Sequence, residues 1–447
     1  MEGYRQAIDR VVTPRVILAF GWTLFFIYSY PGYMSYDSVW QLEQARHIEP
    51  RNEWQPPLMA YVWGLIDKII AGPFPMLVIQ SGTFLFGGWA LLRHAMSERA
   101  AAIVAVVVLL YPANIVVMAV IWKDCQMAGF LLAAIPALMS PKRGWRITGY
   151  VLIFLATGYR YNAAAATLPI VLGLFAWGKT LSRRRRYGIS LGLWFGITVA
   201  SLVANGLVTE KRMHPWQVAA APLDIVGTMR FATKQDDATI LREYPDVPWA
   251  LKQDIWRRIL YSYRSINSYL EVTTLEDAVI KPPTTEAERD GISAAWKKLV
   301  TEHPIAFARH RVGVFWQQIK VRTGGDYGFW VGFTNADWGE QILEHKAKHS
   351  SLQQWWIENL VRYDHWFGLR VYVYFILLFA FLPFAWRYRL GFVVIASGIL
   401  HELGLFLIAP AIDYRYSHWM VVCSILGGIL VFVKRRQQRV ARQSPAG

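Results

Sequence analysis

Repeated apolar runs of about 15 to 21 residues limit the folds open to this chain more than any other feature of its sequence. A helix rises about 1.5 Å per residue, so runs of this length approach the thickness of the hydrocarbon core of a bilayer. We therefore predict an all-α polytopic membrane protein. The first run follows three arginines and has no small-residue cleavage site after it, so we expect it to remain as an anchor.

Lysine and arginine residues indicate which side of the membrane the connecting loops face. Twenty of them, against three acids, lie in six short segments: 1–15, 93–99, 140–146, 178–187, 387–389 and the tail from Lys434. The long polar stretch 209–365 holds 20 bases and 20 acids. Since basic residues in short loops mark the cytoplasmic side, we expect these segments and both termini in the cytoplasm. This distribution argues against a nucleic-acid partner, although the formal net charge is +16.

About ten transmembrane helices satisfy this arrangement. The predicted spans are 16–31, 74–92, 101–121, 125–139, 147–158, 163–178, 188–208, 367–386, 390–412 and 417–433. A further apolar stretch, 56–72, is interrupted by Asp67 and Lys68 and would reach only about 24 Å as a helix. We expect this stretch to lie along the membrane or to re-enter it.

These spans divide the chain into three parts. We predict an N-terminal transmembrane module at 1–208 with a catalytic outer loop at 32–73, a mainly helical extracytoplasmic domain at 209–365, and a C-terminal transmembrane module with a basic cytoplasmic tail at 366–447. Within the middle part, the capping-box pattern of Thr285 and Glu288 predicts one helix start. Pro304 stands at a plausible first position of a second helix.

Several polar residues interrupt or border the apolar runs on the predicted outer face. They are Asp37 after the first span, Lys123 and Asp124 between the third and fourth, Arg160 and Asn162 between the fifth and sixth, and Tyr414 and Arg415 before the last. Ionisable groups are costly at a membrane, so a cluster of them indicates a site.

Each of these charged residues also has a structural alternative. Asp37 could favour a helix N-terminus ahead of a capping box at Ser38 to Gln41. Lys123 and Asp124 could form an interfacial pair, and the two arginines could reach out to lipid phosphates.

An acid beside several cations suits glycosyl transfer from a lipid phosphate. Phosphate is a competent leaving group, so the enzyme needs cations for its developing charge and one carboxylate for the proton of the acceptor hydroxyl. Arginine binds phosphate through two hydrogen bonds, and Lys123 could add a point charge. A glycosidase would instead need a second acid as its nucleophile or base partner. The polar residues of the predicted outer face supply both a carboxylate and a set of cations.

Other polar residues are possible pocket members. Trp40 and Gln55 lie in the outer loop. Trp40 or Trp54 could stack on a sugar, or both could belong to an interfacial aromatic belt. His401 and Glu402 fall inside the predicted ninth span. They could form a buried hydrogen-bonding unit or belong to an acceptor pocket. They do not form a zinc-protease HExxH motif, because Leu405 stands at the second histidine position.

The order of these motifs resembles the GT-C superfamily of integral-membrane glycosyltransferases, which includes protein O-mannosyltransferases and the lipid A aminoarabinose transferase. The motifs are "SYDS", "WQPPL", "WKD", "RYN" and "DYRY", and the resemblance covers roughly 1–208 and 367–433. It implies an enzyme of the plasma (inner) membrane that moves a sugar from a polyprenyl-phosphate donor to a cell-envelope glycan, lipid or protein acceptor, with inversion.

The resemblance also implies roles for individual residues. Asp37 matches the catalytic base, and Asp124 matches a second acid that helps the acceptor or a metal. Arg160 and Arg415, with Lys123 and Tyr414, would bind the donor phosphate.

The chain departs from the mannosyltransferase pattern at two positions, because Ser38 replaces a second adjacent acid and Gln55 replaces a histidine before Pro56. We therefore expect no required cofactor, with a divalent cation left open if Asp37 and Asp124 converge. Two other functions also stay open. One is a ligase or polymerase that uses a lipid-diphosphate-linked glycan, and the other is a transporter of lipids or solutes, which would need polar residues on both sides of the membrane midplane.

Overall fold

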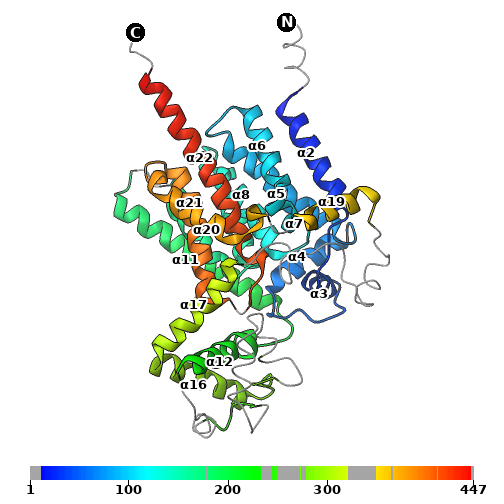
Figure 1. The fold of residues 1–447 in the computed structure, drawn as a ribbon, viewed down its shortest axis with the longest axis vertical. Helices are drawn as coiled ribbons and strands as arrows, with labels where there is room; N and C mark the ends of the chain where they lie inside the picture. Colours follow the sequence, from blue (N-terminus) through cyan, green and yellow to red (C-terminus); the bar gives the residue numbers. More distant parts are fainter. Residues whose placement is uncertain are drawn as a thin grey trace. The chain divides into compact units, whose positions relative to one another are not determined.

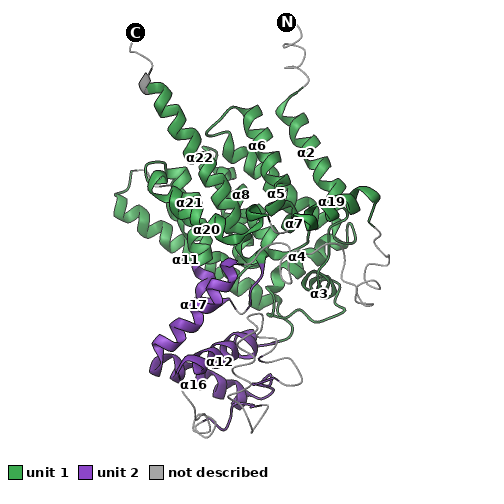
Figure 2. Ribbon diagram, in the orientation of Figure 1, with its two compact units in different colours: residues 1–211, 322–402, 414–447 green, residues 212–321, 403–413 purple. Residues whose placement is uncertain are grey.

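The computed structural model describes residues 12–177, 180–232, 244–249, 272, 278–320, 349–363, 366–409 and 411–443. The chain forms two compact units, coloured separately in Figure 2. The first unit comprises 1–211, 322–402 and 414–447, and the second comprises 212–321 and 403–413. The predicted modules instead divide the chain at 208 and at 365, and they keep 403–413 with the C-terminal spans.

The first unit is built from helices (Figure 1). In chain order they are α2 (Pro14–Ser29), α3 (Tyr36–Ala45), α4 (Pro57–Asp67), α5 (Phe74–Leu92), α6 (Glu98–Leu110), α7 (Pro112–Met118), α8 (Lys123–Met139), α9 (Arg143–Tyr159), α10 (Ala163–Leu174), α11 (Arg183–Val208), α19 (Ser351–Arg362), the short η2 (Phe367–Leu369), α20 (Val371–Ala385), α21 (Arg389–Ile408), the short η3 (Tyr414–Ser417) and α22 (His418–Gln443). Helix α21 continues into the second unit from Leu403.

Several of these helices are suited to a membrane. In the described part of the chain, four are long and apolar enough to cross it: Phe74–Leu92, Arg183–Val208, Arg389–Ile408 and Tyr414–Ala441. Helices α6 and α7 add a fifth if they count as one broken span, and α2, α10 and α20 are shorter apolar helices. The structure therefore agrees with a helical membrane protein, but the predicted count of about ten spans is not confirmed.

The predicted single span 101–121 is bent. Helix α6 ends at Leu110, Tyr111 is extended, and α7 starts at Pro112 at an angle of 68° to α6. Proline disfavours helical backbone in the residue before it and cannot donate a backbone hydrogen bond. Pro112 thus accounts for the break.

Small residues allow the helices of the first unit to approach closely. Helix α8 packs against both α5 and α9. A Cβ atom added at Gly87 of α5 would lie 2.6 Å from the backbone nitrogen of Ala133, and one added at Gly129 of α8 would lie 2.3 Å from Thr83 Oγ1. Glycine lets neighbouring helix backbones touch in this way, which is how helices associate in membranes.

Two short helices, α3 and α4, follow α2. Helix α4 has 11 residues, and it corresponds to the stretch that we predicted not to cross the membrane as a simple span. Helix α3 begins after Ser35, whose hydroxyl pairs with Ser38 in a capping box. The alternative capping box from Ser38 to Gln41 is therefore wrong, because Ser38 already lies in the first turn. Asp37 does lie in the first turn of α3, as its structural alternative expected. Gly64 of α4 packs against the carbonyl of Ala45, the last residue of α3.

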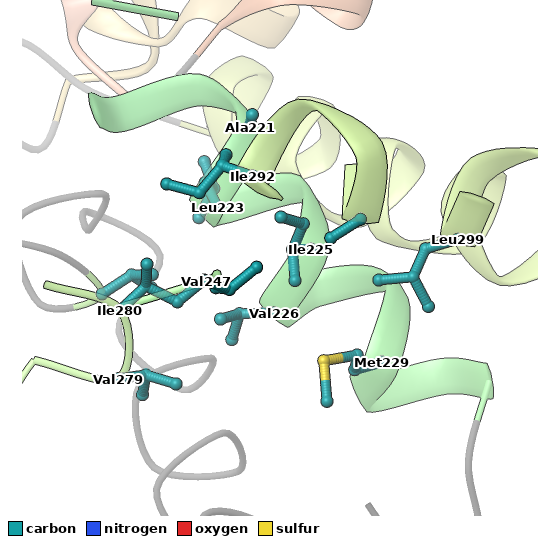
Figure 3. Packing of buried hydrophobic residues seen from close by; sticks show 12 residues of the cluster. Ala221, Leu223, Ile225, Val226, Met229, Val247, Val279, Ile280, Ile292 and Leu299 are labelled. Carbon is teal, nitrogen blue, oxygen red and sulfur yellow. The ribbon is translucent and has the colours of Figure 1, made fainter. Parts of the chain in front are cut away.

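The second unit is also helical in its described part. It contains η1 (Trp216–Ala220), α12 (Ala221–Ala232), α16 (Glu286–Glu302), α17 (Pro304–Lys320) and the end of α21. The predicted capping box of Thr285 and Glu288 is present, and α17 starts at Pro304 as predicted. Ile225 and Val226 of α12 pack with Ile292 and Leu299 of α16 in an apolar core (Figure 3).

A buried polar network joins the helices of this unit. The Asp224 carboxylate accepts hydrogen bonds from the indole of Trp296 at 2.9 Å and from the His310 ring at 3.1 Å. Arg311 lies 3.4 Å from the same carboxylate and donates to the carbonyls of Leu407 and Ala409. The network connects α12, α16, α17 and the end of α21 within the second unit.

Candidate functional site

Hydrogen bonds hold the loop before α3 against the loop before α8. The amide of Tyr33 donates to the carbonyl of Ala119 at 2.8 Å, and the amide of Ile121 donates back to the carbonyl of Tyr33 at 2.9 Å. The hydroxyl of Ser38 donates to the carbonyl of Ile121 at 2.7 Å. Asp37, which precedes Ser38, is thereby fixed near the start of α8.

Two aspartate–arginine pairs form in this region. Arg415 Nη2 lies 2.5 Å from Asp37 Oδ2, and Arg160 Nε lies 3.0 Å from Asp124 Oδ1. The Asp37 side chain is 31% exposed, whereas that of Asp124 is fully buried. The first pair is therefore accessible to a ligand, and the second lies beneath the surface.

Aromatic rings connect the two pairs. The guanidinium groups of Arg160 and Arg415 lie over the ring of Tyr416, at 4.7 Å and 5.5 Å from its centre. Arg415 also lies 4.7 Å from the ring of Trp122. Arginine stacks well on aromatic faces, so these rings fix both guanidinium planes. We call Asp37, Lys123, Asp124, Arg160 and Arg415 the charged cluster.

Lys123 gives the charged cluster an excess of positive charge. Its side chain is only 8% exposed, and no hydrogen bond or ion pair joins it to another described residue. It feels the charges of both aspartates and both arginines. With three cations against two carboxylates, the charged cluster can accommodate one further negative charge, and a buried cation without a direct partner favours such an anion.

The same cations act on Asp37. Burial opposes ionisation of this carboxyl, but the positive charges of Arg415, Lys123 and Arg160, with a hydrogen bond from Arg415, outweigh burial and lower its pKa to about 2. Asp37 is thus an ionised carboxylate at physiological pH. It is also a weak base as long as Arg415 remains unoccupied.

Asp37 also lines an open cleft beside α3. The cleft has a volume of about 320 Å³, and its walls are Tyr36, Asp37, Trp40, Glu43 and Glu49. Burial and the neighbouring charge of Glu49 raise the pKa of Glu43. Aromatic faces with carboxylates among them can stack on a sugar ring and accept its hydroxyl hydrogens. One carboxylate therefore faces both the cations and a polar cleft.

The other predicted residues take different places. Trp40 lines the cleft, but Gln55 is buried, 2% exposed, and is not among the cleft walls. Asn162 follows the loop of Arg160, and its amide lies 3.4 Å from the His401 ring. Glu402 accepts a hydrogen bond of 2.8 Å from Ser417. His401 and Glu402 are thus buried in hydrogen-bonded pairs within the first unit.

Tyr414 does not join the charged cluster. Its side chain is fully buried, and its hydroxyl donates to the carbonyl of Ala113 at 3.4 Å. No hydrogen bond among the described residues connects it to the residues of the charged cluster. From this segment, Arg415 contacts Asp37, and the ring of Tyr416 contacts the guanidinium groups of Arg160 and Arg415.

Sequence reasoning missed Trp122, Tyr416 and three walls of the cleft, Tyr36, Glu43 and Glu49. Trp122 and Tyr416 stand beside predicted residues, in "IWKD" and "DYRY", so their position offered a signal. Glu43 and Glu49 offered none, because acids on a short amphipathic helix or just after it usually face solvent. His418 was missed too: it is buried at the start of α22 and stacks on Phe84.

The two aspartates of the charged cluster do not form a metal centre with other ligands. Among the described residues, no group of three or more histidine, cysteine, aspartate or glutamate side chains could hold a metal ion. Each aspartate is instead paired with its own arginine. The residues present suit an anion better than a cation.

Comparison of the chain with protein-family models, with curated proteins and with solved structures finds no match. The function must therefore be argued from the charged cluster and its cleft.

Proposed function

We propose that the protein is a membrane glycosyltransferase that moves a sugar from a polyprenyl-phosphate donor to an acceptor hydroxyl with inversion, outside the cytoplasm. The observation that carries this proposal is the position of Asp37. Its carboxylate pairs with Arg415 and also lines the cleft beside α3. A base, a phosphate-binding cation and a polar cleft thus meet at one residue.

The charges fit the substrate and the reaction. A sugar joined to a lipid through phosphate is a phosphodiester with one negative charge, and the charged cluster has one positive charge in excess. When the sugar leaves, the phosphate gains negative charge. Arg415 and Lys123 would stabilise that charge in the transition state, because preorganised cations at a developing anion lower the barrier.

The proposed step balances as a single displacement. The acceptor oxygen forms a bond to the anomeric carbon of the sugar, and the bond from that carbon to the phosphate oxygen breaks with its electron pair. The proton of the acceptor hydroxyl moves to the Asp37 carboxylate. Attack from the face opposite the phosphate inverts the anomeric centre, and no second carboxylate nucleophile is needed.

The donor would activate the base. While Arg415 is paired with Asp37, the carboxylate is weakly basic, with a pKa of about 2. A donor phosphate on Arg415 would neutralise part of that positive charge and raise the pKa of Asp37. The base would therefore become effective only when the donor is bound.

A transfer assay tests the proposal. The purified full-length chain in nanodiscs would be mixed with polyprenyl-phosphate sugars and a hydroxyl-bearing envelope glycan, lipid or peptide. We expect one sugar mass added to the acceptor, free polyprenyl phosphate, and an inverted anomeric centre by NMR. A polymeric product would support a glycan ligase or polymerase instead. Movement of an unaltered donor between leaflets would support a transporter.

The pH dependence of the reaction is a further prediction. Because the pKa of Asp37 in the free protein is about 2, kcat/KM should not fall with decreasing pH until the pH is below about 4. The bound phosphate raises this pKa, so the acidic limb of kcat should lie at higher pH than that of kcat/KM. Initial rates between pH 4 and 8, at low and at saturating donor, should therefore show a flat kcat/KM and an acidic limb only in kcat. A fall of kcat/KM with an apparent pKa above about 5 would contradict Asp37 as the base.

A further inference from the structure

A second groove lies among helices α10, α11 and α21 of the first unit. Its volume is about 590 Å³, and its walls are largely apolar, with Leu172, Phe175, Val393 and Leu400 among them. These residues are separate from the charged cluster and from the cleft beside α3.

Three arginines also line this groove: Arg183 and Arg186 at the start of α11, and Arg389 at the start of α21. No acidic residue is among the walls that the described part of the chain provides. The three come from the basic segments 178–187 and 387–389, which are far apart in the sequence and which we predicted on the same side of the membrane. The fold brings arginines of these two segments to one groove.

Hydrogen bonds to backbone hold two of the guanidinium groups in place. Arg186 Nη2 donates to the carbonyl of Phe175 at 2.8 Å, and Arg389 Nε donates to the carbonyl of Gly173. Arg186 Nε is buried and has no hydrogen-bond partner among the described residues. None of the three arginines forms an ion pair with a carboxylate in the part of the chain that the structure describes. The groove therefore combines positive charge that no protein acid neutralises with an apolar wall.

We infer that this groove binds one anionic phospholipid, with its phosphate at the arginines and an acyl chain along the apolar wall. Arginine recognises phosphate through charged hydrogen bonds, and basic pockets between membrane helices bind anionic lipid head groups. Helix α11 is a candidate span that buries only Ser190, Ser201 and Asn205 in the described structure, so most of its surface is free to face lipid. This inference does not depend on the proposed glycosyl transfer.

The arginine run offers a matched pair of variants. Arg183 and Arg186 line the groove, whereas Arg184 and Arg185, between them, do not. Arg183→Gln with Arg186→Gln removes two charges from the groove, and Arg184→Gln with Arg185→Gln removes two charges from the same turn of the helix outside it. If the protein is attracted to anionic membranes only through its overall charge, both double variants should weaken lipid binding equally. If the groove is a specific lipid site, only Arg183→Gln with Arg186→Gln should weaken it.

Native mass spectrometry of the full-length chain, titrated with phosphatidylglycerol or phosphatidylcholine, measures the effect. We expect one phosphatidylglycerol bound more tightly than phosphatidylcholine, a loss of about tenfold or more in that affinity for Arg183→Gln/Arg186→Gln, and little change for Arg184→Gln/Arg185→Gln. Equal losses in the two double variants, or no preference for the anionic lipid in the unaltered chain, would overturn the inference.

Two further arms keep the test decisive. Ala396→Trp should fill the apolar part of the groove without changing its charge, and it should also weaken phosphatidylglycerol binding. If Arg183→Gln/Arg186→Gln does not fold, Arg389→Gln replaces it and should likewise weaken phosphatidylglycerol binding. Inorganic phosphate at millimolar concentration should not displace the lipid. Displacement by phosphate, with retained binding in Ala396→Trp, would instead mean a site for a soluble anion.

Discussion

Asp37→Asn should lower kcat by about 100-fold or more, the usual effect of removing a positioned base. Asparagine has the same shape but cannot accept the proton of the acceptor hydroxyl. Donor affinity should stay the same or increase, because Arg415 loses the carboxylate that now competes with the phosphate for its guanidinium group. Single-turnover rates and equilibrium binding of polyprenyl phosphate would separate the two effects.

Asp67→Asn is the matched control. Asp67 pairs with Arg46 at 2.8 Å and accepts a hydrogen bond of 2.7 Å from the amide of Gly72, but it belongs neither to the charged cluster nor to the cleft. Its loss should reduce thermal stability and leave kcat within about threefold of the unaltered chain, because no reacting group is touched. Similar kcat losses in Asp37→Asn and Asp67→Asn would mean that Asp37 acts only through the fold of the segment 32–73.

The members of the charged cluster could be chosen from the sequence, but their partners could not. Asp37, Asp124, Arg160 and Arg415 each border an apolar run, where ionisable residues are costly. Which arginine meets which aspartate depends on how the loops of distant segments pack. The hydrogen bonds between Tyr33 and the 119–121 loop bring the segment of Asp37 to that of Asp124, and they involve backbone atoms that any sequence would supply.

Local rules explain other differences between the prediction and the structure. Both halves of the α6–α7 segment are apolar, so hydropathy alone predicted one span, although Pro112 carried the signal of a break. The pattern at Ser38 also fitted a capping box, but Ser38 is held in the first turn of α3 by Ser35 and by its hydrogen bond to the distant Ile121.

The number of spans could not be predicted from charge because charge orients loops without fixing helix length. Helix α10 has 12 residues and α20 has 15, which are fewer than a bilayer usually requires. Basic segments still follow both helices in the sequence, so the charge rule counted each helix as a span. Glu43 and Glu49 escaped prediction as cleft walls for a different reason, since only the fold decides whether an acid on α3 or just after it lines a cleft or faces solvent.

Arg415→Ala should weaken binding of polyprenyl phosphate by about 1.5 to 3 kcal/mol, the range for a hydrogen bond to a charged group. Arg415 is the better choice than Arg160 for this measurement. Arg160 pairs with the fully buried Asp124, so its removal would leave an unpaired charge inside the protein and destabilise the fold. Asp37 is partly exposed, so water can solvate it when Arg415 is lost.

A double-mutant cycle with Asp37→Asn decides whether Arg415 binds the phosphate or only positions Asp37. If Arg415 binds phosphate, Asp37→Asn/Arg415→Ala should bind polyprenyl phosphate about 10-fold or more weakly than Asp37→Asn. The double variant should also bind somewhat more tightly than Arg415→Ala, because the unpaired Asp37 carboxylate no longer repels the ligand. If Arg415 serves only to hold Asp37, removing it after Asp37 has become asparagine should change nothing. Equal affinities of Asp37→Asn and the double variant would therefore remove Arg415 from the donor site.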